Sequence, residues 1–538
     1  MEGMLPLVDP MQARLGQATP SEDPASPIPA SPGSLWWLLV VGLAAALLCM
    51  PFVRTVYLDA DEGVFLHAAE RMLRGQRLYA DFFEFLPPGS FVLTAAWFGL
   101  TGISMVAARS LAILTIVGIA SFTFLACRRA SSNAPLSALL TIGWVVMSQG
   151  VWTQVSHHWF TTLISMVAIW AALGGVQDVP GRFRWPLIAG IAAGTAVMVT
   201  PTRGALVMLA ALTVFLGRRR IRTELIVYLL GAALAPIGLF AYVIEQDILA
   251  PAFNDVIHFT TERYASIQGV PFGYQAALQN FPLLYLFPLA ALLAMAVSAR
   301  DWRAAFRDHP LRICAVFGLA GFVGCYPRPD IGHISITAPL ACPLLACCAT
   351  RLTRSWRPVY RHAAAGVAIG LCAPSALAFS RISEEAVRAE IVSTPRGGVV
   401  FVGLPDQRSL MARIAMTPYG QAYFFYPFMP LLPFLTAREH VSKYDVFVPG
   451  YTAPSQYREA CISAIRHASW VVIDRRWTDR DFLRRNFPAM RDTEPQEIKR
   501  FDQALADSFE LVVQEGPYEL RSGRQGLSDT ACAEIRAE

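Results

Sequence analysis

Residues 57–89 read YLDADEGVFLHAAERMLRGQRLYADFFEFLPPG, and this stretch places carboxylates directly after an apolar segment. The preceding segment, residues 35–53, is long enough to cross a bilayer, because about 30 Å of hydrocarbon takes roughly 20 helical residues. Charged groups are costly inside hydrocarbon. The acidic residues therefore either sit in water as a plain linker or carry out chemistry at the membrane face. They are Asp59, Asp61, Glu62, Glu70, Asp81 and Glu84.

The middle of this stretch, residues 62–78, has the periodicity of an amphipathic helix. Apolar residues recur at helical spacing from Val64 to Leu73, while Arg71, Arg74 and Arg77 take other positions. Such a helix is expected to lie on the membrane surface. Asp61 and Glu62 fall in its first turn, where the helix dipole favours negative charge. Helix capping is thus one explanation for the acidic pair, and catalysis is the other.

The whole chain is strongly apolar, with 54 % hydrophobic and 16 % charged residues, which indicates a membrane protein with many spans. The first apolar segment is not a simple signal peptide, because a Pro/Ser-rich head precedes it and more spans follow. Residues 1–34 are expected to form a disordered cytoplasmic head. The net charge of +5 is spread over short loops, a pattern that orients membrane proteins rather than binding nucleic acid.

Arginine clusters mark the cytoplasmic ends of the spans. The clusters alternate with far-side loops only if the apolar run at residues 87–102 does not cross, so we expect that run to lie at, or dip into, the far face. If it did cross, several clusters would fall on the wrong side. The predicted fold is therefore a polytopic α-helical bundle with eleven spans, at residues 35–53, 105–126, 134–149, 158–177, 185–199, 203–217, 224–243, 279–298, 311–326, 333–350 and 360–379.

Residues 35–379 form the predicted transmembrane domain, and residues 54–104 are its first far-side loop, which carries the surface helices. Residues 380–538 are polar and mixed. Short strand patterns at 397–404 and 469–477, a helix pattern at 494–509 and two strands within 509–522 predict a small α/β domain, placed outside the cytoplasm by the same alternation. Cys461 and Cys532 are its only cysteines, and they either form a disulfide or remain two free thiols.

The order of motifs in residues 57–89 resembles the first extracytoplasmic loop of the GT-C superfamily of membrane glycosyltransferases. The similarity is greatest to the family 39-type branch, which includes the protein O-mannosyltransferases, the aminoarabinose transferases and bacterial galacturonosyltransferases. The shared pattern is the acidic pair Asp61-Glu62, an apolar helix ending at Gly75, Tyr79 and Asp81 separated by one residue, and the Pro87-Pro88 pair.

This resemblance implies transfer of a sugar from a polyprenyl-phosphate donor to an envelope glycolipid, glycan or protein. It further implies a multi-pass protein of the bacterial inner membrane, with the active site and the C-terminal domain in the periplasm. The catalytic carboxylate carries over to Asp61, and Glu62 matches the second member of the pair. A carboxylate within reach of the acceptor hydroxyl can take its proton during attack on the anomeric carbon, and the family expectation is inversion.

Asp59 adds a third acid to the pair, giving the run Asp-Ala-Asp-Glu. It could orient the acceptor or bind a divalent cation. Three acidic residues at this spacing are weak support for a metal, so we expect a site with neither metal nor other cofactor.

A leaving lipid phosphate requires cations near the bilayer face. The far-side candidates are Arg203, Arg328 and His333, with Asp330 placed to orient the latter two. The alternatives are that Arg203 reaches the lipid headgroups and that His333 makes only a local bond at a helix start. The remaining candidates for the acceptor or its loop are Tyr79, Asp81 and His158; of the adjacent pair His157-His158, only one is expected to face the cavity.

Two other functions compete with glycosyl transfer. A lipid-linked saccharide flippase or polymerase is also a multi-span protein, and a non-catalytic scaffold could bind envelope glycan through its C-terminal domain. An ion-coupled pathway would place ionisable residues near the middle of the spans. Here they gather at one face, which favours an enzyme cavity open to the membrane surface.

Overall fold

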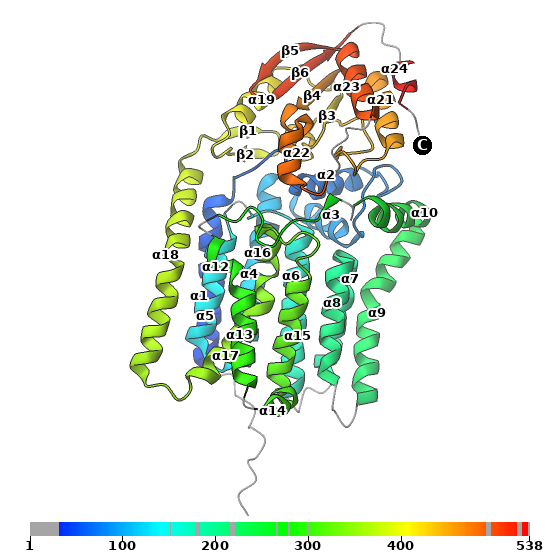
Figure 1. The fold of residues 1–538 in the computed structure, drawn as a ribbon. Coiled ribbons are helices and arrows are strands. Elements are labelled where there is room, and N and C mark those ends of the chain that lie inside the picture. Colours follow the sequence, from blue (N-terminus) through cyan, green and yellow to red (C-terminus); the bar gives the residue numbers. More distant parts are fainter. Residues whose placement is uncertain are drawn as a thin grey trace, which may run out of the picture.

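The computed structural model describes residues 32–150, 152–177, 183–215, 221–264, 267–277, 280–299, 301–490, 496–524 and 530–535. The disordered head predicted at residues 1–34 lies outside these ranges, except for its last three residues. A bundle of helices carries a mixed α/β domain at one of its ends (Figure 1).

The helices of the bundle coincide with the predicted spans. They are α1 (Pro32–Cys49), α4 (Met105–Ser131), α5 (Ala134–Ser148), α6 (His157–Gln177), α7 (Arg184–Val199), α8 (Pro201–Leu212), α9 (Ile221–Glu245), α12 (Phe281–Leu284), α13 (Leu286–Ser298), α15 (His309–Val323), α16 (Ile331–Thr337), α17 (Cys342–Thr353) and α18 (Pro358–Arg388). Six helical stretches are long and apolar enough to cross a membrane, and six shorter apolar helices accompany them within the described residues. The chain is a multi-pass membrane protein, while the count of eleven spans stays a prediction.

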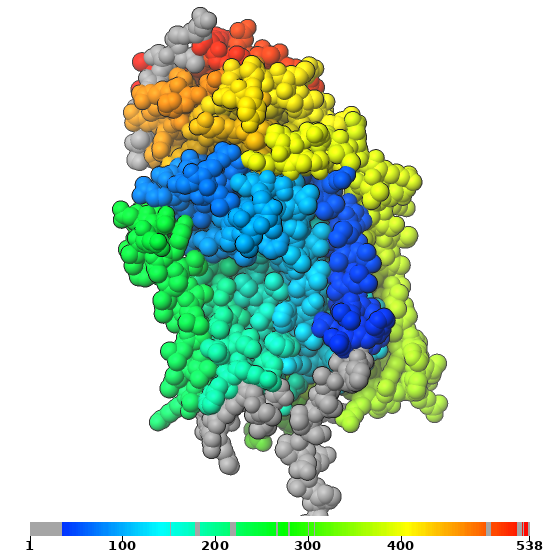
Figure 2. Space-filling model, turned by 180° about the vertical axis from the view of Figure 1, so that it is seen from behind, coloured from blue at the N-terminus to red at the C-terminus, as the bar shows by residue number. Residues whose placement is uncertain are grey.

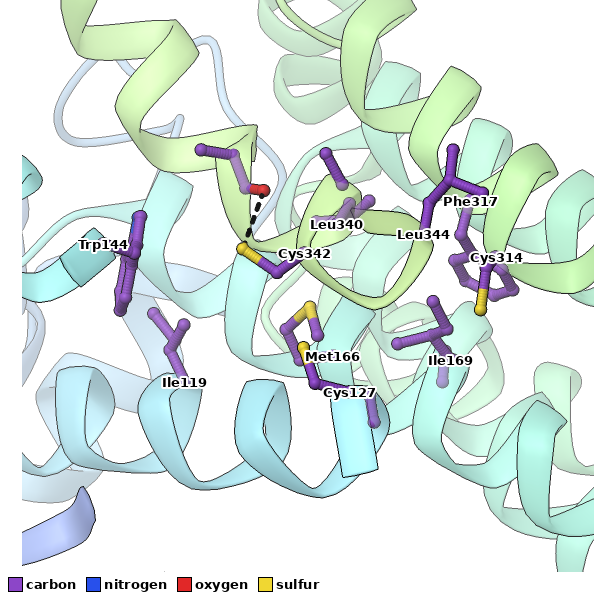
Figure 3. Close-up of a cluster of buried hydrophobic side chains, with 14 of the residues drawn as sticks. Ile119, Cys127, Trp144, Met166, Ile169, Cys314, Phe317, Leu340, Cys342 and Leu344 are labelled. Carbon is purple, nitrogen blue, oxygen red and sulfur yellow. Dashed lines mark hydrogen bonds between the residues drawn. The ribbon is translucent and has the colours of Figure 1, made fainter. Parts of the chain in front are cut away.

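The centre of the bundle is filled by small and sulfur-containing side chains. Cys127, Met166 and Cys342 lie together between helices α4, α6 and α17 (Figure 3), and all three are fully buried. The Cys342 thiol donates a hydrogen bond to the carbonyl of Ala338 over 3.6 Å. These thiols fill space as small apolar groups, as cysteine commonly does in protein interiors, and the small residues allow the helices to approach closely.

A layer of short helices separates the bundle from the C-terminal domain (Figures 1 and 2). It contains α2 (Glu62–Leu73), α3 (Gly89–Thr101), α10 (Leu249–Phe253) and the π-helix η4 (Asn254–Tyr264). The helix predicted in residues 62–78 is confirmed as α2, although it ends earlier. The apolar run at 87–102 forms α3, which lies beside α2.

Helix α2 does not lie on an open surface as its pattern suggested, because every residue from Glu62 to Arg71 is buried. Its charged side chains find partners in the C-terminal domain. Arg71 donates to the carbonyl of Ser442 over 3.3 Å, and Glu70 pairs with Arg396. His67 Nδ1 lies 2.9 Å from a carboxylate oxygen of Asp445. Protein therefore covers the polar face that the amphipathic pattern assigned to water.

The C-terminal domain contains a four-stranded sheet in the order β3-β4-β6-β5. Its strands are β3 (Tyr423–Tyr426), β4 (Trp470–Asp474), β5 (Phe509–Glu515) and β6 (Tyr518–Gly523), and a hairpin of β1 (Val392–Thr394) and β2 (Gly397–Val399) precedes it. Strands β3 and β4 are parallel, and the other pairs are antiparallel. The predicted α/β domain is confirmed, but β3 was not predicted.

Helices flank this sheet: α19 (Pro405–Ala415), α20 (Leu431–Thr436), α21 (Pro454–His467), η7 (Arg475–Thr478), α22 (Arg480–Asn486), α23 (Gln496–Ser508) and α24 (Thr530–Ala533). Cys461 on α21 and Cys532 on α24 form a disulfide. The bridge decides between the two alternatives that the sequence left open, and it ties the last described helix to the body of the domain.

The contact between α2 and α20 requires a glycine at position 63. A Cβ on Gly63 would run into the backbone of Pro430 and Leu431, and backbone cannot yield as a flexible side chain can. We predict that Gly63→Ala lowers the midpoint of thermal unfolding in detergent, with an overpacking cost of about 1–3 kcal/mol.

Gly238→Ala on α9 is the matched control, because a Cβ there would meet no atom within 4 Å. The control should leave the midpoint unchanged or raise it slightly, since alanine favours helix. Equal midpoints for the two variants would contradict the close approach of α2 and α20.

Candidate active site

A cavity of about 460 Å³ lies where the bundle meets the C-terminal domain. The start of α2, the residues before α6 and the start of α16 form its bundle side. Tyr264, Gln268 and Gln275, with several segments of the C-terminal domain, form the rest. Its polar lining residues are Tyr57, Asp59, Asp61, Gln154, His157, His158, Tyr264, Gln268, Gln275, Arg328, Asp330, His333, Tyr451 and Asn486.

Asp61 occupies the N-cap position of α2, yet its side chain makes no capping hydrogen bond. Among the described residues the carboxylate has no hydrogen-bond partner at all, although it is accessible from the cavity. Enclosure by the protein raises the pKa of the Asp61 carboxyl, while the charges of His333 and Arg328 oppose this rise. An unpartnered carboxylate with a raised pKa is suited to accept a proton from a bound hydroxyl.

Glu62 turns away from the cavity and is almost fully buried. Arg109 on α4 donates to it, and the backbone N–H of Val155 donates to the same carboxylate over 2.8 Å. Adjacent residues on a helix point in different directions, so one acid of the pair faces the cavity and the other faces the bundle. These bonds hold the Glu62 side chain on the bundle side of Asp61.

Asp59 lines the cavity and contacts the C-terminal domain directly. One of its carboxylate oxygens lies 3.3 Å from a guanidinium nitrogen of Arg476, which also donates to Asp474 over 2.6 Å and to the hydroxyl of Tyr518 over 2.8 Å. Arg476 therefore supplies positive charge at this carboxylate. The described residues include no group of three His, Cys, Asp or Glu side chains placed to hold a metal, and the expectation of a metal-free site stays a prediction.

Arg328, Asp330 and His333 also line the cavity and form a connected cluster. Asp330 accepts from Arg328 Nε over 2.7 Å, and its other oxygen lies 2.7 Å from His333 Nδ1. Burial alone would raise the pKa of Asp330, but the bonds and charges of His333 and Arg328 outweigh it and lower that pKa. The lowered pKa favours the ionised form of Asp330, and its two oxygens hold the side chains of Arg328 and His333.

His157 and His158 both line the cavity, although only one of them was expected to. Their ring centroids lie 3.7 Å apart, and that of His158 lies 5.0 Å from His333. Arg203 sits behind them. Its guanidinium bonds His158 Nδ1 and the carbonyl of Gly324, each over 2.9 Å. Arg203 therefore supports the histidines rather than lining the cavity.

Tyr79 and Asp81 lie outside the cavity and shape the loop after α2. Tyr79 has a positive φ of 67°, and its hydroxyl donates to the carbonyl of Leu86 over 2.6 Å. The Asp81 carboxylate accepts from the backbone N–H of Arg77 over 2.6 Å. This part of the motif builds a turn that leads into α3.

The C-terminal domain contributes site residues that sequence reasoning missed. Arg476, Trp477 and Tyr451 come from segments far along the chain from Asp61, and no local pattern marks them. Tyr264 comes from the long segment between α9 and α12. Arg476 is the second residue after strand β4 and reaches the site through its contact with Asp59. Only the fold brings these residues together.

The bundle, the acidic first loop and the α/β domain over the cavity together make up a fold that solved structures of one other membrane protein share. The crystal structure of ArnT from Cupriavidus metallidurans bound to undecaprenyl phosphate aligns with 93 % of this chain and 99 % of its own, with a TM-score of 0.54 and 15 % identity. The apo structure of the same protein covers 94 % and 99 %, with a TM-score of 0.53 and 16 % identity.

A cryo-EM structure of the mycobacterial arabinofuranosyltransferase AftD aligns with 92 % of this chain and 40 % of its own at 13 % identity. Its TM-score of 0.46 is too low to show a shared fold. No protein-family profile matches the sequence, and no curated protein matches it either. The comparisons thus support the fold.

The Asp59–Arg476 contact should couple the first loop to the C-terminal domain energetically. We predict that Asp59→Asn and Arg476→Gln each lower the thermal unfolding midpoint in detergent, and that the double variant unfolds at a higher temperature than additive effects would give. Both side chains are about one quarter exposed, so the coupling should be small, on the order of 0.5–1 kcal/mol.

Arg485→Gln on α22, an exposed arginine of the same domain, serves as the control and should show no coupling to Asp59→Asn. Strict additivity of Asp59→Asn with Arg476→Gln would show that the contact does not link the two parts.

Proposed function

We propose that this protein is an integral-membrane glycosyltransferase of the bacterial inner membrane. It transfers a sugar from a polyprenyl-phosphate donor to an envelope glycolipid, glycan or protein at the periplasmic face. The observation that supports this most directly is the Asp61 carboxylate, which is unpartnered and faces a cavity that also contains Arg328 and His333. The solved ArnT with this fold binds undecaprenyl phosphate, which supports a lipid phosphate as the donor here.

In the proposed mechanism, Asp61 accepts the proton of the acceptor hydroxyl while the hydroxyl oxygen attacks the anomeric carbon. The bond from that carbon to the phosphate oxygen breaks, and the phosphate leaves with the electron pair. A single displacement inverts the configuration at the carbon. Arg328 and His333 stabilise the charge that develops on the phosphate, and Asp330 holds both in place.

The orientation of the chain follows from two observations. The arginine-rich connection between α17 and α18 lies at the end of the bundle opposite the C-terminal domain (Figure 1), and arginines of short loops favour the cytoplasm. The C-terminal domain contains the Cys461–Cys532 disulfide, which belongs in an oxidising compartment. Both observations support a periplasmic cavity and domain.

The competing functions would use the same surroundings differently. A flippase or polymerase needs a path or a binding surface for lipid-linked saccharide but no base at position 61. A scaffold needs only the C-terminal domain. Neither explains why Asp61 is left without a partner while Glu62, the next residue, is fully engaged.

Substitution of Asp61 tests the proposed function. A deletion strain complemented with wild type should regain one sugar mass on an envelope glycolipid or glycan, measured by mass spectrometry. Asp61→Asn should fail to restore it at equal expression, because loss of a general base costs about 10²–10⁴-fold in rate.

Asp81→Asn is the matched control, because Asp81 is an exposed carboxylate of the same loop that bonds only locally. It should restore the sugar mass. Restoration by Asp61→Asn as well would overturn the catalytic role and favour the flippase or scaffold.

The raised pKa of Asp61 gives the reaction a characteristic pH dependence. Transfer needs the ionised carboxylate, so kcat/KM should fall tenfold per pH unit on the acidic side. The midpoint should lie above the ordinary aspartate value of 3.8, because enclosure raises the pKa. Arg328→Gln removes a charge that opposes this rise and should move the midpoint further up.

The pH profile is measured on purified protein with native lipid extracts as donor and acceptor. A midpoint that moves to lower pH in Arg328→Gln would assign the titration to a group other than Asp61. The same conclusion would follow if the residual activity of Asp61→Asn kept the midpoint while Arg328→Gln lost it.

A further inference from the structure

A second cavity of about 660 Å³ lies beside the first, between η4 and the C-terminal domain. Its walls come from β3, η7, α21, α22 and α23, and from Glu262, Arg263 and Ile267. Trp477 lines both cavities. This volume is far larger than an ion needs and falls within the range of sites for organic ligands, about 300–1,000 Å³.

The same chain segments line both cavities and so form a partition between them. Tyr264 and Gln268 line the first cavity, while Ile267 lines the second. Along residues 448–451, Val448 and Tyr451 face the first cavity, and the two residues between them face the second. The partition belongs to one apolar cluster, which contains Phe259, Ile267, Phe428, Val448, Tyr451, Trp477 and Leu483.

The lining of the second cavity combines aromatic rings with polar groups of both signs. Tyr426, Phe447 and Tyr457 form its aromatic floor, with ring centroids of 5.5 Å and 5.6 Å for the two pairs that include Phe447. Glu262, Arg263, Thr478, Arg480 and Asp502 supply the polar groups. The buried indole N–H of Trp477 finds no hydrogen-bond partner in the described part of the chain.

This combination fits a saccharide better than a lipid or an ion. A sugar ring presents an apolar C–H face that packs on an aromatic ring, and hydroxyl edges that exchange hydrogen bonds with carboxylates, guanidinium groups and hydroxyls. A lipid chain offers no hydrogen-bonding groups to a wall that carries charged and hydroxyl side chains. A compact anion would meet carboxylates as well as arginines.

We propose that the second cavity is a saccharide-binding site that holds a sugar portion of the acceptor while the acceptor hydroxyl enters the first cavity. The identification of the bound saccharide as part of the acceptor rests on the proposed function, whereas saccharide binding itself does not. Trp477 is the side chain that both parts of the acceptor would contact, and its neighbour Arg476 holds Asp59 at the catalytic loop.

The test uses the full-length protein in detergent. The probes are envelope oligosaccharides released from the host strain by mild acid, with binding followed by saturation-transfer NMR and transfer followed with envelope glycolipid extract as acceptor. Ala489→Trp fills the cavity from an exposed position, and Arg480→Ala removes an exposed charged group from its wall. Gln503→Trp, exposed on α23 and outside both cavities, is the control.

We expect Ala489→Trp to abolish the saturation-transfer signal and to raise KM for the acceptor about tenfold with kcat little changed. Arg480→Ala should also reduce the saturation-transfer signal and raise the KM for the acceptor. Gln503→Trp should resemble wild type. No oligosaccharide signal with wild type, or an undiminished signal with both cavity variants, would overturn the proposal.

Asp61→Asn separates this proposal from the proposed function. It should bind the oligosaccharides as wild type does while transferring no sugar. If wild type transfers nothing but binds oligosaccharide in a manner that Ala489→Trp abolishes, then the saccharide site stands and the transferase proposal fails. If wild type and Ala489→Trp both transfer sugar with the same KM for the acceptor, then the transferase proposal stands and the saccharide site fails.

Discussion

The buried ion pair between Glu62 and Arg109 fixes the start of α2, and the candidate active site depends on it. Both side chains are almost fully excluded from solvent. Arg109 also bonds the carbonyl of Thr55 over 2.5 Å, and Glu62 accepts from the backbone of Val155. Removing one partner of a buried pair leaves an uncompensated charge, which costs about 3–5 kcal/mol. The pair therefore holds the first loop, α4 and the segment before α6 in one arrangement.

This arrangement explains why two adjacent acids are useful. Glu62 is neutralised and serves as an anchor, whereas Asp61, about 100° further round the helix by the geometry of 3.6 residues per turn, is delivered to the cavity without a partner. A carboxylate that already accepted capping or ion-pair hydrogen bonds would be a weaker base, because those bonds lower its pKa. The bonds that hold Glu62 therefore also fix the helix turn that leaves Asp61 without a partner.

Much of this architecture follows from the sequence, and the failures have physical causes. Apolar length locates the bundle helices, and the Arg-x-Asp-x-x-His spacing brings Arg328, Asp330 and His333 together because they lie within six residues. Amphipathic periodicity gives α2 but cannot tell membrane surface from a covering protein domain, so its burial was missed. That both His157 and His158 line the cavity, where only one was expected to, was not predicted because the direction of a side chain at a helix start depends on the preceding loop.

The residues contributed by the C-terminal domain could not be predicted, because no local pattern connects position 476 to position 59. Yet the domain completes the fold of the first loop. The carboxylate of Asp445 is held ionised by His67, because their hydrogen bond and opposite charges outweigh burial and lower its pKa. Gln407 accepts from the backbone N–H of Leu58 over 3.3 Å, and the backbone of Val56 donates to Val400 over 3.1 Å.

His67, Glu70 and Arg71 each have a partner in that domain, and these bonds offset part of the cost of burying the polar face of α2. The loop that carries Asp61 is consequently shaped from both sides, by Arg109 below and by the C-terminal domain above. The geometry of the candidate site belongs to the junction of the two parts, and neither part contains it alone.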